Sequence, residues 1–206
     1  MGGCVALVGA LEGWLRVDRL VASAPMIDLS LVRWPGLIRL VARALARLGL
    51  SGRLVPGGRL HSISTEPFAG NRLCGDERRY ARNAAVARAL GPAAIGSPTL
   101  GWLVAAYEAM ARLAAAGCAS RIRVPTLIIG AGDDPVCSTP AAERFARELG
   151  SDAFVLIPGA RHEVMMESDG IRAAFWRAFD GFVPGPDAPR SAGQEAKHVV
   201  VQATVA

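Results

Sequence analysis

The chain has 206 residues, enough for one domain with an inserted subdomain, and 51% of them are hydrophobic while 20% are charged. This balance is typical of globular proteins and excludes a chain that is disordered over most of its length. The formal net charge is +5, but scattered arginines carry nearly all of the positive charge and no motif interleaves them with aromatic residues, so we expect no nucleic-acid partner.

The first predicted unit, residues 1–29, is a helix followed by a strand. Residues 4–13 are apolar and rich in alanine, and residues 17–24 form a short apolar run that ends at Pro25. A short apolar run bounded by proline is typical of a buried strand rather than of a core helix. We therefore expect this unit to belong to the core of an α/β domain.

Residues 30–120 contain helical patterns and no clear strand. The predicted helices cover residues 35–48, 76–90 and 99–117, and loops rich in Gly, Ser and Pro join them. An insertion of helices between two strands of a sheet predicts a helical cap over an active site.

The first cap helix is amphipathic, with an arginine every four residues on one face. Arg39, Arg43 and Arg47 form this face. The opposite face carries Leu37, Leu40, Val41, Ala44 and Leu48. We expect the arginines to be solvated and the apolar face to pack against the cap core. The alternative is a basic helix that contacts an anionic lipid surface.

Three large aromatic side chains of the cap, Trp34, Trp102 and Tyr107, are predicted to be core residues. The alternative is that they line an acyl pocket beneath the cap.

Residues 121–183 return to alternating strands and helices. We predict strands over 124–130 and 153–157 and amphipathic helices over 140–149 and 168–182. This order predicts a parallel sheet that is covered on both faces, which is an α/β fold. Residues 184–206 change to a polar, Pro- and Gly-containing composition and are predicted to be a disordered tail.

Asp134 and His162 each follow one of these later strands. The carboxyl ends of adjacent parallel strands meet at one edge of a sheet, where such sheets bind ligands, so we expect the two side chains to lie together. An acid followed in sequence by a histidine is the order found in α/β-hydrolase triads. Asp133 is the alternative acid, and an ordinary turn with a loop histidine is the non-functional interpretation.

A nucleophile to complete such a triad is not evident in the sequence. Ser23 follows a different strand and Ser138 lies beyond the acid, so neither stands on the required strand-to-helix turn. Cys4, Cys74, Cys118 and Cys137 are far apart and lack the spacing of a zinc or redox site, so we expect four buried thiols. We expect no metal and no organic cofactor.

Five stretches of residues 1–183 together resemble the lysophospholipase and monoacylglycerol lipase group of α/β-hydrolases, particularly lysophospholipase L2-like proteins with a serine aminopeptidase-type domain. They are MGG at 1–3, VDRLVASAPM at 17–26, NRLCGD at 71–76, GSPTLGW at 96–102 and PGARHE at 158–163. The resemblance implies about three strands of the C-terminal part of the hydrolase sheet, with an inserted helical cap. It also implies a serine nucleophile, in a Gly-His-Ser pattern, directly before Met1.

The same resemblance implies an oxyanion hole that uses the backbone N–H of Met1 and a donor from an earlier loop. We therefore expect a serine hydrolase that cleaves carboxylic esters of lipid-like alcohols, with this chain by itself inactive. The exposed edge of the first strand predicts poor solubility for the isolated chain. A peptidase or general carboxylesterase of the same fold, and a non-catalytic interaction module, are the alternatives.

The expected location is cytoplasmic, and peripheral membrane contact through the first cap helix is the alternative. The sequence shows no signal-peptide pattern at its start and no apolar run of about 18 residues that could span a bilayer. The pattern does not specify the acyl chain, the head group or the oligomeric state.

Overall fold

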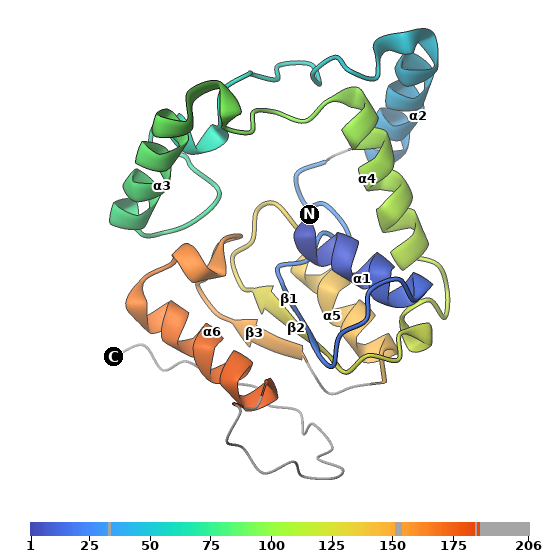
Figure 1. Cartoon of the computed structure of the whole chain (residues 1–206), viewed down its shortest axis with the longest axis vertical. Coiled ribbons are helices and arrows are strands. Elements are labelled where there is room, and N and C mark those ends of the chain that lie inside the picture. The colour runs from blue at the N-terminus through green and yellow to red at the C-terminus, as the bar shows by residue number, and fades with distance from the viewer. Residues whose placement is uncertain (33, 151–153, 184, 186–206) are drawn as a thin grey trace.

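A computed structural model describes residues 1–32, 34–150, 154–183 and 185 of the protein. The predicted tail, apart from residue 185, lies outside the described residues. Figure 1 shows a small sheet with helices on both faces and further helices beyond one edge.

The sheet has three parallel strands in the order β1-β2-β3. They are β1 (Leu20–Ser23), β2 (Thr126–Ala131) and β3 (Phe154–Ile157). Leu20 pairs with Thr126, and Ile128 pairs with Phe154. This arrangement confirms the predicted parallel α/β sheet. β1 starts three residues later than residue 17, where its strand was predicted to begin.

Alternate residues of β2 point to opposite faces of the sheet, and all six are buried. Helices therefore cover both faces. α1 (Gly2–Glu12), α4 (Leu100–Leu113) and α5 (Thr139–Glu148) share one apolar core with Ile128 of β2. α6 (Asp169–Phe182) packs on the other face, against a second core that contains Leu127 and Ile129. Figure 1 shows α6 on the side of the sheet opposite α1 and α5.

The described part of residues 30–120 contains helices and short turns but no strand. α2 (Pro35–Leu45) continues into a wider turn at Ala46–Leu50, and α3 (Glu77–Leu90) precedes α4. Single turns of 3-10 helix lie at Ile63–Thr65, Gly91–Ala93, Ala119–Arg121 and Val164–Met166. Figure 1 shows α2 and α3 far apart at the two ends of an extended segment. α2 packs against α4.

Side-chain caps explain where two of these helices begin. Asp76 accepts a hydrogen bond from the backbone N–H of Arg79 at 3.0 Å, and Thr99 accepts one from Trp102 at 3.2 Å. Both residues precede the first helical residue, as N-caps do, although the predicted ranges counted them as helical. The predicted first cap helix ends three residues early, and Gly49, with φ of 82°, turns the chain just beyond.

The prediction for the two faces of α2 is wrong. Leu37, Leu40, Val41 and Leu48 are all exposed, Leu40 at 66% and Leu48 at 76%. Arg43 pairs with Glu108 of α4 at 2.8 Å, whereas Arg47 is exposed as predicted. An apolar stripe indicates that a helix has two faces, but a cap of few helices offers little surface against which to bury one. α2 therefore presents its apolar face outward.

The aromatic core prediction holds for one of its three residues. Tyr107 is buried, whereas Trp34 is 65% exposed at the start of α2 and Trp102 is partly exposed. The four cysteines are buried and free, as predicted. No helix among the described residues has the length and apolarity needed to cross a membrane.

Candidate active site

Asp134 and His162 meet at the carboxyl edge of the sheet. Asp134 lies in the loop after β2, and His162 lies in the loop after β3. His162 Nδ1 and Asp134 Oδ2 are 2.9 Å apart, which is a hydrogen bond. The spacing along the sequence predicted that these loops would bring the two side chains together, and the structure places them in contact.

The Asp134 carboxylate is buried, and both of its oxygens accept hydrogen bonds. Its side chain is 1% exposed, and Oδ1 accepts the backbone N–H groups of Val136 at 2.8 Å and Cys137 at 3.0 Å. Burial raises the pKa of this carboxyl, but the hydrogen bonds from His162, Cys137 and Val136 outweigh it and hold the pKa below its usual value. Asp134 is therefore ionised at neutral pH.

Asp133, the alternative acid, is placed differently. Its side chain is exposed, while its backbone N–H donates to the carbonyl of Ala160 at 2.8 Å. That backbone bond joins the loop after β2 to the loop after β3. Asp133 thus helps to hold the two loops together, and Asp134 is the residue that contacts the histidine.

The hydrogen bond determines which nitrogen of His162 is available for chemistry. An ionised carboxylate only accepts, so His162 donates from Nδ1, and Nε2 is the ring nitrogen left to take a proton. The side chain of His162 is 20% exposed, in contrast to its buried partner. This arrangement can serve as a general base that is oriented from behind by a carboxylate.

The first turn of α1 lies at the same edge. Gly3 packs so closely on Pro25, two residues after β1, that a Cβ at position 3 would lie 3.0 Å from the Cβ of Pro25. The amino group of Met1 is close enough to Cys137, the neighbour of Asp134, to oppose the rise of its thiol pKa. Figure 1 shows the N-terminus above the sheet, where the loops after the strands gather. The start of α1 and the Asp134–His162 pair therefore share one region.

Neither serine considered in the sequence takes the place of a nucleophile. Ser138 accepts a hydrogen bond from the backbone of Ala141 and caps α5, and Ser23 is the last residue of β1. Among the hydrogen bonds of the described residues, none joins a serine hydroxyl to His162.

Three potential metal ligands cluster at this site. The ligand atoms of Asp134, Cys137 and His162 lie within 4.8 Å of one another. Burial raises the pKa of the Cys137 thiol to about 12, and a metal needs the thiolate. Asp134 already accepts three hydrogen bonds. The donor set fits a hydrogen-bonded acid–histidine pair better than a metal centre.

A buried carboxylate, Glu167, supports the loop that carries His162. Its Oε1 accepts the backbone N–H of Arg161 at 2.9 Å, and its Oε2 accepts that of Gly75 at 2.8 Å. The residue is 2% exposed. Because Arg161 directly precedes His162, Glu167 holds the backbone next to the histidine and ties it to a segment about ninety positions away.

Glycine at position 75 leaves room for this contact, because a Cβ there would lie 2.8 Å from Glu167 Oε2 and the carboxylate would have to shift. Two further bonds join the same segments. The backbone N–H of Glu163 donates to the carbonyl of Leu73 at 2.7 Å, and the Arg161 guanidinium donates to the carbonyl of residue 71 at 3.2 Å. Residues 71–76 thus form part of the wall behind the histidine loop.

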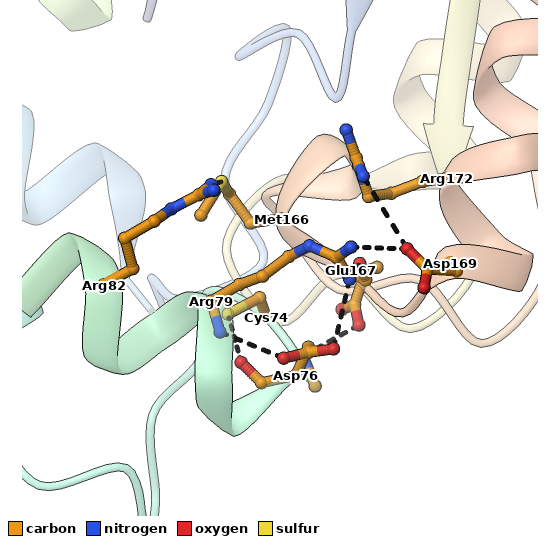
Figure 2. Close-up of polar contacts among 9 residues, drawn as sticks. Cys74, Asp76, Arg79, Arg82, Met166, Glu167, Asp169 and Arg172 are labelled. Carbon is orange, nitrogen blue, oxygen red and sulfur yellow. Dashed lines mark hydrogen bonds and ion pairs between the residues drawn. The ribbon is translucent and has the colours of Figure 1, made fainter.

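Arg79 of α3 completes this connection, as Figure 2 shows. Its guanidinium bonds to Asp76 at 3.1 Å, to the backbone carbonyl of Glu167 at 2.6 Å and to Asp169 of α6 at 2.5 Å. The Arg79 side chain is mostly buried, so these bonds are screened less than those of a surface pair. We refer to Gly75, Asp76, Arg79, Glu167 and Asp169 as the Glu167 network.

The Glu167 network was missed by sequence reasoning. The NRLCGD stretch at 71–76 did mark one side of it as a matching motif. The other side carried no signal, because a single glutamate before a helix resembles an ordinary surface residue.

Known proteins match the chain in family and in fold. Residues 1–169 match the model of the family described as serine aminopeptidase, S33. No curated protein matches the sequence.

Three of the similar solved structures are lipid or ester hydrolases. A soluble variant of monoglyceride lipase from Saccharomyces cerevisiae, in complex with a substrate analog, has a TM-score of 0.65 at 18% identity over 87% of this chain. The monoacylglycerol lipase of Paleococcus ferrophilus has 0.61 at 19% identity over 86%. A thermostable carboxyl esterase from Bacillus coagulans, in complex with glycerol, has 0.54 at 14% identity over 87%.

These similarities show a shared fold, the α/β-hydrolase fold, and the three strands correspond to part of its sheet. The chain spans 57% of the length of the first of these structures and 62% of the other two.

Proposed function

Because the chain belongs to the serine aminopeptidase S33 family of α/β-hydrolases, we propose that it supplies the acid and the base of a serine hydrolase that cleaves carboxylic esters of lipid-like alcohols. The observation that carries the proposal is the 2.9 Å bond between His162 and a buried, ionised Asp134 at the carboxyl edge of the sheet. The neighbouring first turn of α1 supports it, since in this fold the nucleophile stands where a strand turns into a helix.

The proposed nucleophile is a serine directly before Met1. His162 Nε2 would take the proton of its hydroxyl as the oxygen attacks the ester carbonyl, and Asp134 would stabilise the resulting imidazolium. The backbone N–H of Met1 would donate to the oxyanion of the tetrahedral intermediate. His162 would then give its proton to the departing alcohol, and water would release the acid from the acyl-enzyme by the same steps.

The same scheme leads us to propose that the 206-residue chain alone does not hydrolyse esters. One oxyanion donor is worth about 3 kcal/mol of transition-state stabilisation, and the scheme also needs a nucleophilic hydroxyl. An isolated Met1 carries an ammonium group instead of an amide N–H.

The preference for lipid-like esters rests on similarity. Two of the similar structures are monoglyceride and monoacylglycerol lipases by name, and one holds a substrate analog. We propose a monoacylglycerol or a lysophospholipid as the substrate class. The family description also names an aminopeptidase activity, so an aminoacyl arylamide belongs in the same test.

The test is hydrolysis by the longest form of the protein that its gene encodes. We expect turnover of monoacylglycerol or lysophospholipid, loss of turnover in His162→Gln, and little cleavage of aminoacyl arylamides. Arylamide cleavage in place of ester cleavage would support the peptidase alternative. No turnover of any of the three, with a folded protein, would favour a non-catalytic module.

We also propose that the apolar face of α2 contacts a lipid interface. Leu37, Leu40 and Val41 of α2 are exposed, as are Trp34 directly before the helix and Leu48 in the turn after it. Arg43 is engaged with Glu108, and only Arg47 of the three arginines is exposed, so binding should depend on apolar insertion more than on anionic lipid. Sedimentation with zwitterionic vesicles tests this contact. Leu40→Glu should weaken binding, and Val86→Glu, on the exposed surface of α3, is the matched control.

A further inference from the structure

A cavity of about 460 Å³ lies between α2, α4 and α5, and neither Asp134 nor His162 lines it. Its volume is within the range of about 300–1,000 Å³ that is usual for small-molecule sites. The function proposed above makes no use of this cavity. Its lining nevertheless contains polar groups that point to a ligand.

Two hydrogen-bond donors in its lining have no acceptor. Arg39 Nε and the Tyr107 hydroxyl are both buried, and neither has a hydrogen-bond partner among the residues that the structure describes. Tyr107 is 7% exposed. Burial, with the charge of Asp28, raises the pKa of the Tyr107 phenol, so the hydroxyl stays protonated. Buried donors are nearly always paired in proteins, so these two call for a ligand with acceptor oxygens.

The start of α2 adds a second, independent preference for an anion. Pro35 and Gly36, the first residues of this 11-residue helix, line the cavity. No side chain caps the helix at Trp34. The first N–H groups of a helix lack partners within the helix, and its N-terminus carries a partial positive charge that favours anions.

The charged groups around the cavity limit how much negative charge the ligand can carry. Arg144 lines the cavity together with Arg39, but Asp28 and Glu148 line it too. None of these four forms an ion pair with another residue in the described part of the chain. Two cations against two carboxylates suit a ligand with one negative charge better than a dianion such as phosphate.

The rest of the lining is apolar and suits a hydrocarbon chain. Ile27, Met110, Leu113 and Phe145 contribute to it. A ligand that satisfies both parts of the lining has one carboxylate for the donors and an apolar body for these side chains.

We propose that this cavity binds a monocarboxylate with an apolar chain, the chemical class of a medium-chain fatty acid. Its carboxylate would accept hydrogen bonds from Arg39 of α2 and Tyr107 of α4, in the cavity that Pro35 and Gly36 also line. Such acids are also released when a lipid ester is cleaved, and only this link to product binding rests on the proposed function.

Calorimetric titration of the 206-residue chain with octanoate tests the proposal without any catalytic readout, so the hydrolase proposal can fail independently. We expect saturable 1:1 binding with a Kd of about 1 mM or tighter. Octanol, which lacks the carboxylate, should bind at least about tenfold more weakly.

Two variants and one control locate the site. Tyr107→Phe removes only the hydroxyl, and Arg39→Met removes the guanidinium but keeps much of the chain length. Each should weaken octanoate binding by about tenfold, because hydrogen bonds to a charged group are lost. Arg47→Gln, an exposed arginine outside the cavity lining, should bind like wild type.

Circular dichroism establishes that each variant is folded before binding is compared. Absence of saturable octanoate binding by the folded wild-type chain would overturn the proposal. Equal affinity for octanol and octanoate would also overturn it, as would wild-type affinity in both Tyr107→Phe and Arg39→Met.

Discussion

The sheet buries its apolar residues, whereas the helix α2 exposes most of its own. All six residues of β2 are buried, whereas only Ala42 is buried among the eleven residues of α2. The strand is surrounded by two apolar cores, and α2 contacts mainly α4 and the turn that follows it. Packing therefore fixes the edge that carries Asp134 and His162, while the region of α2 keeps an apolar surface free for contacts outside the chain.

Two sets of polar contacts, the Arg43–Glu108 ion pair and the Glu167 network, hold α2 and α3 to their neighbours. Arg43 joins α2 to α4, and the Glu167 network joins α3 to the loop of His162. The first set of contacts is partly exposed and the second is mostly buried. Substitutions at the sheet edge, in the Glu167 network and on α2 should accordingly differ in size and in what they change.

The largest effect is expected for substitutions at the sheet edge, and it should fall on the catalytic rate. In the longest encoded form, Asp134→Asn or His162→Gln should lower kcat by about 10³-fold or more, because the base loses its orientation or is removed. Steady-state hydrolysis of a monoacylglycerol measures this. Leu40→Glu, assayed on a soluble ester, should retain kcat. Similar losses in all three variants would contradict the division of roles.

The next largest effect is expected at Glu167 and on stability. Glu167→Ala leaves the N–H groups of Gly75 and Arg161 without their acceptor, and removing one partner from a buried charged network costs about 3–5 kcal/mol. Urea unfolding of the 206-residue chain measures the loss.

Glu167→Gln provides the matched comparison, since its single carbonyl oxygen can accept only part of what the carboxylate accepts. It should fall between wild type and Glu167→Ala in unfolding free energy. An unfolding free energy within about 0.5 kcal/mol of wild type for Glu167→Ala, the range of ordinary surface substitutions, would contradict the role of the network.

A smaller, pH-dependent effect is expected at Asp134. Burial raises its pKa, but the hydrogen bonds from His162, Cys137 and Val136 leave the folded-state pKa below the unfolded value. Such a carboxyl contributes stability that is present above the unfolded pKa and lost as pH falls through the folded pKa. The difference in unfolding free energy between wild type and Asp134→Asn should therefore shrink on acidification below about pH 4. A constant difference would contradict this assignment.

The smallest effect on the free energy of unfolding is expected at the exposed Arg43–Glu108 ion pair. Arg43→Gln removes an ion pair whose side chains are 39% and 45% exposed, so it should cost about 1 kcal/mol or less in urea unfolding. A loss as large as that of Glu167→Ala would show that α2 is held as tightly as the sheet edge, against the contrast drawn above.

Local patterns predicted the sheet and the Asp134–His162 contact well. Short apolar runs bounded by proline or glycine gave β2 and β3 within two residues, and parallel topology alone brings their carboxyl ends together. The sequence predicted that Asp134 lies with His162 and left Asp133 as the alternative acid, and the structure gives Asp134 the contact with the histidine.

The remaining features depend on contacts that no local pattern contains. The spacing of Leu37, Leu40 and Val41 shows that α2 has an apolar face but not what that face meets, so its orientation was predicted wrongly. Glu167 gains its meaning only from Gly75, which lies 92 positions away in sequence. Neither the poor solubility nor the inactivity expected for the isolated chain follows from the fold, and both stay predictions.

Labelling with a fluorophosphonate probe, followed by mass spectrometry of peptides, tests the central claim that Asp134 and His162 activate a serine. In the longest encoded form, we predict one modified residue, a serine directly before Met1, and loss of labelling in His162→Gln. Labelling of a residue within positions 1–206, or labelling that persists without His162, would contradict the account.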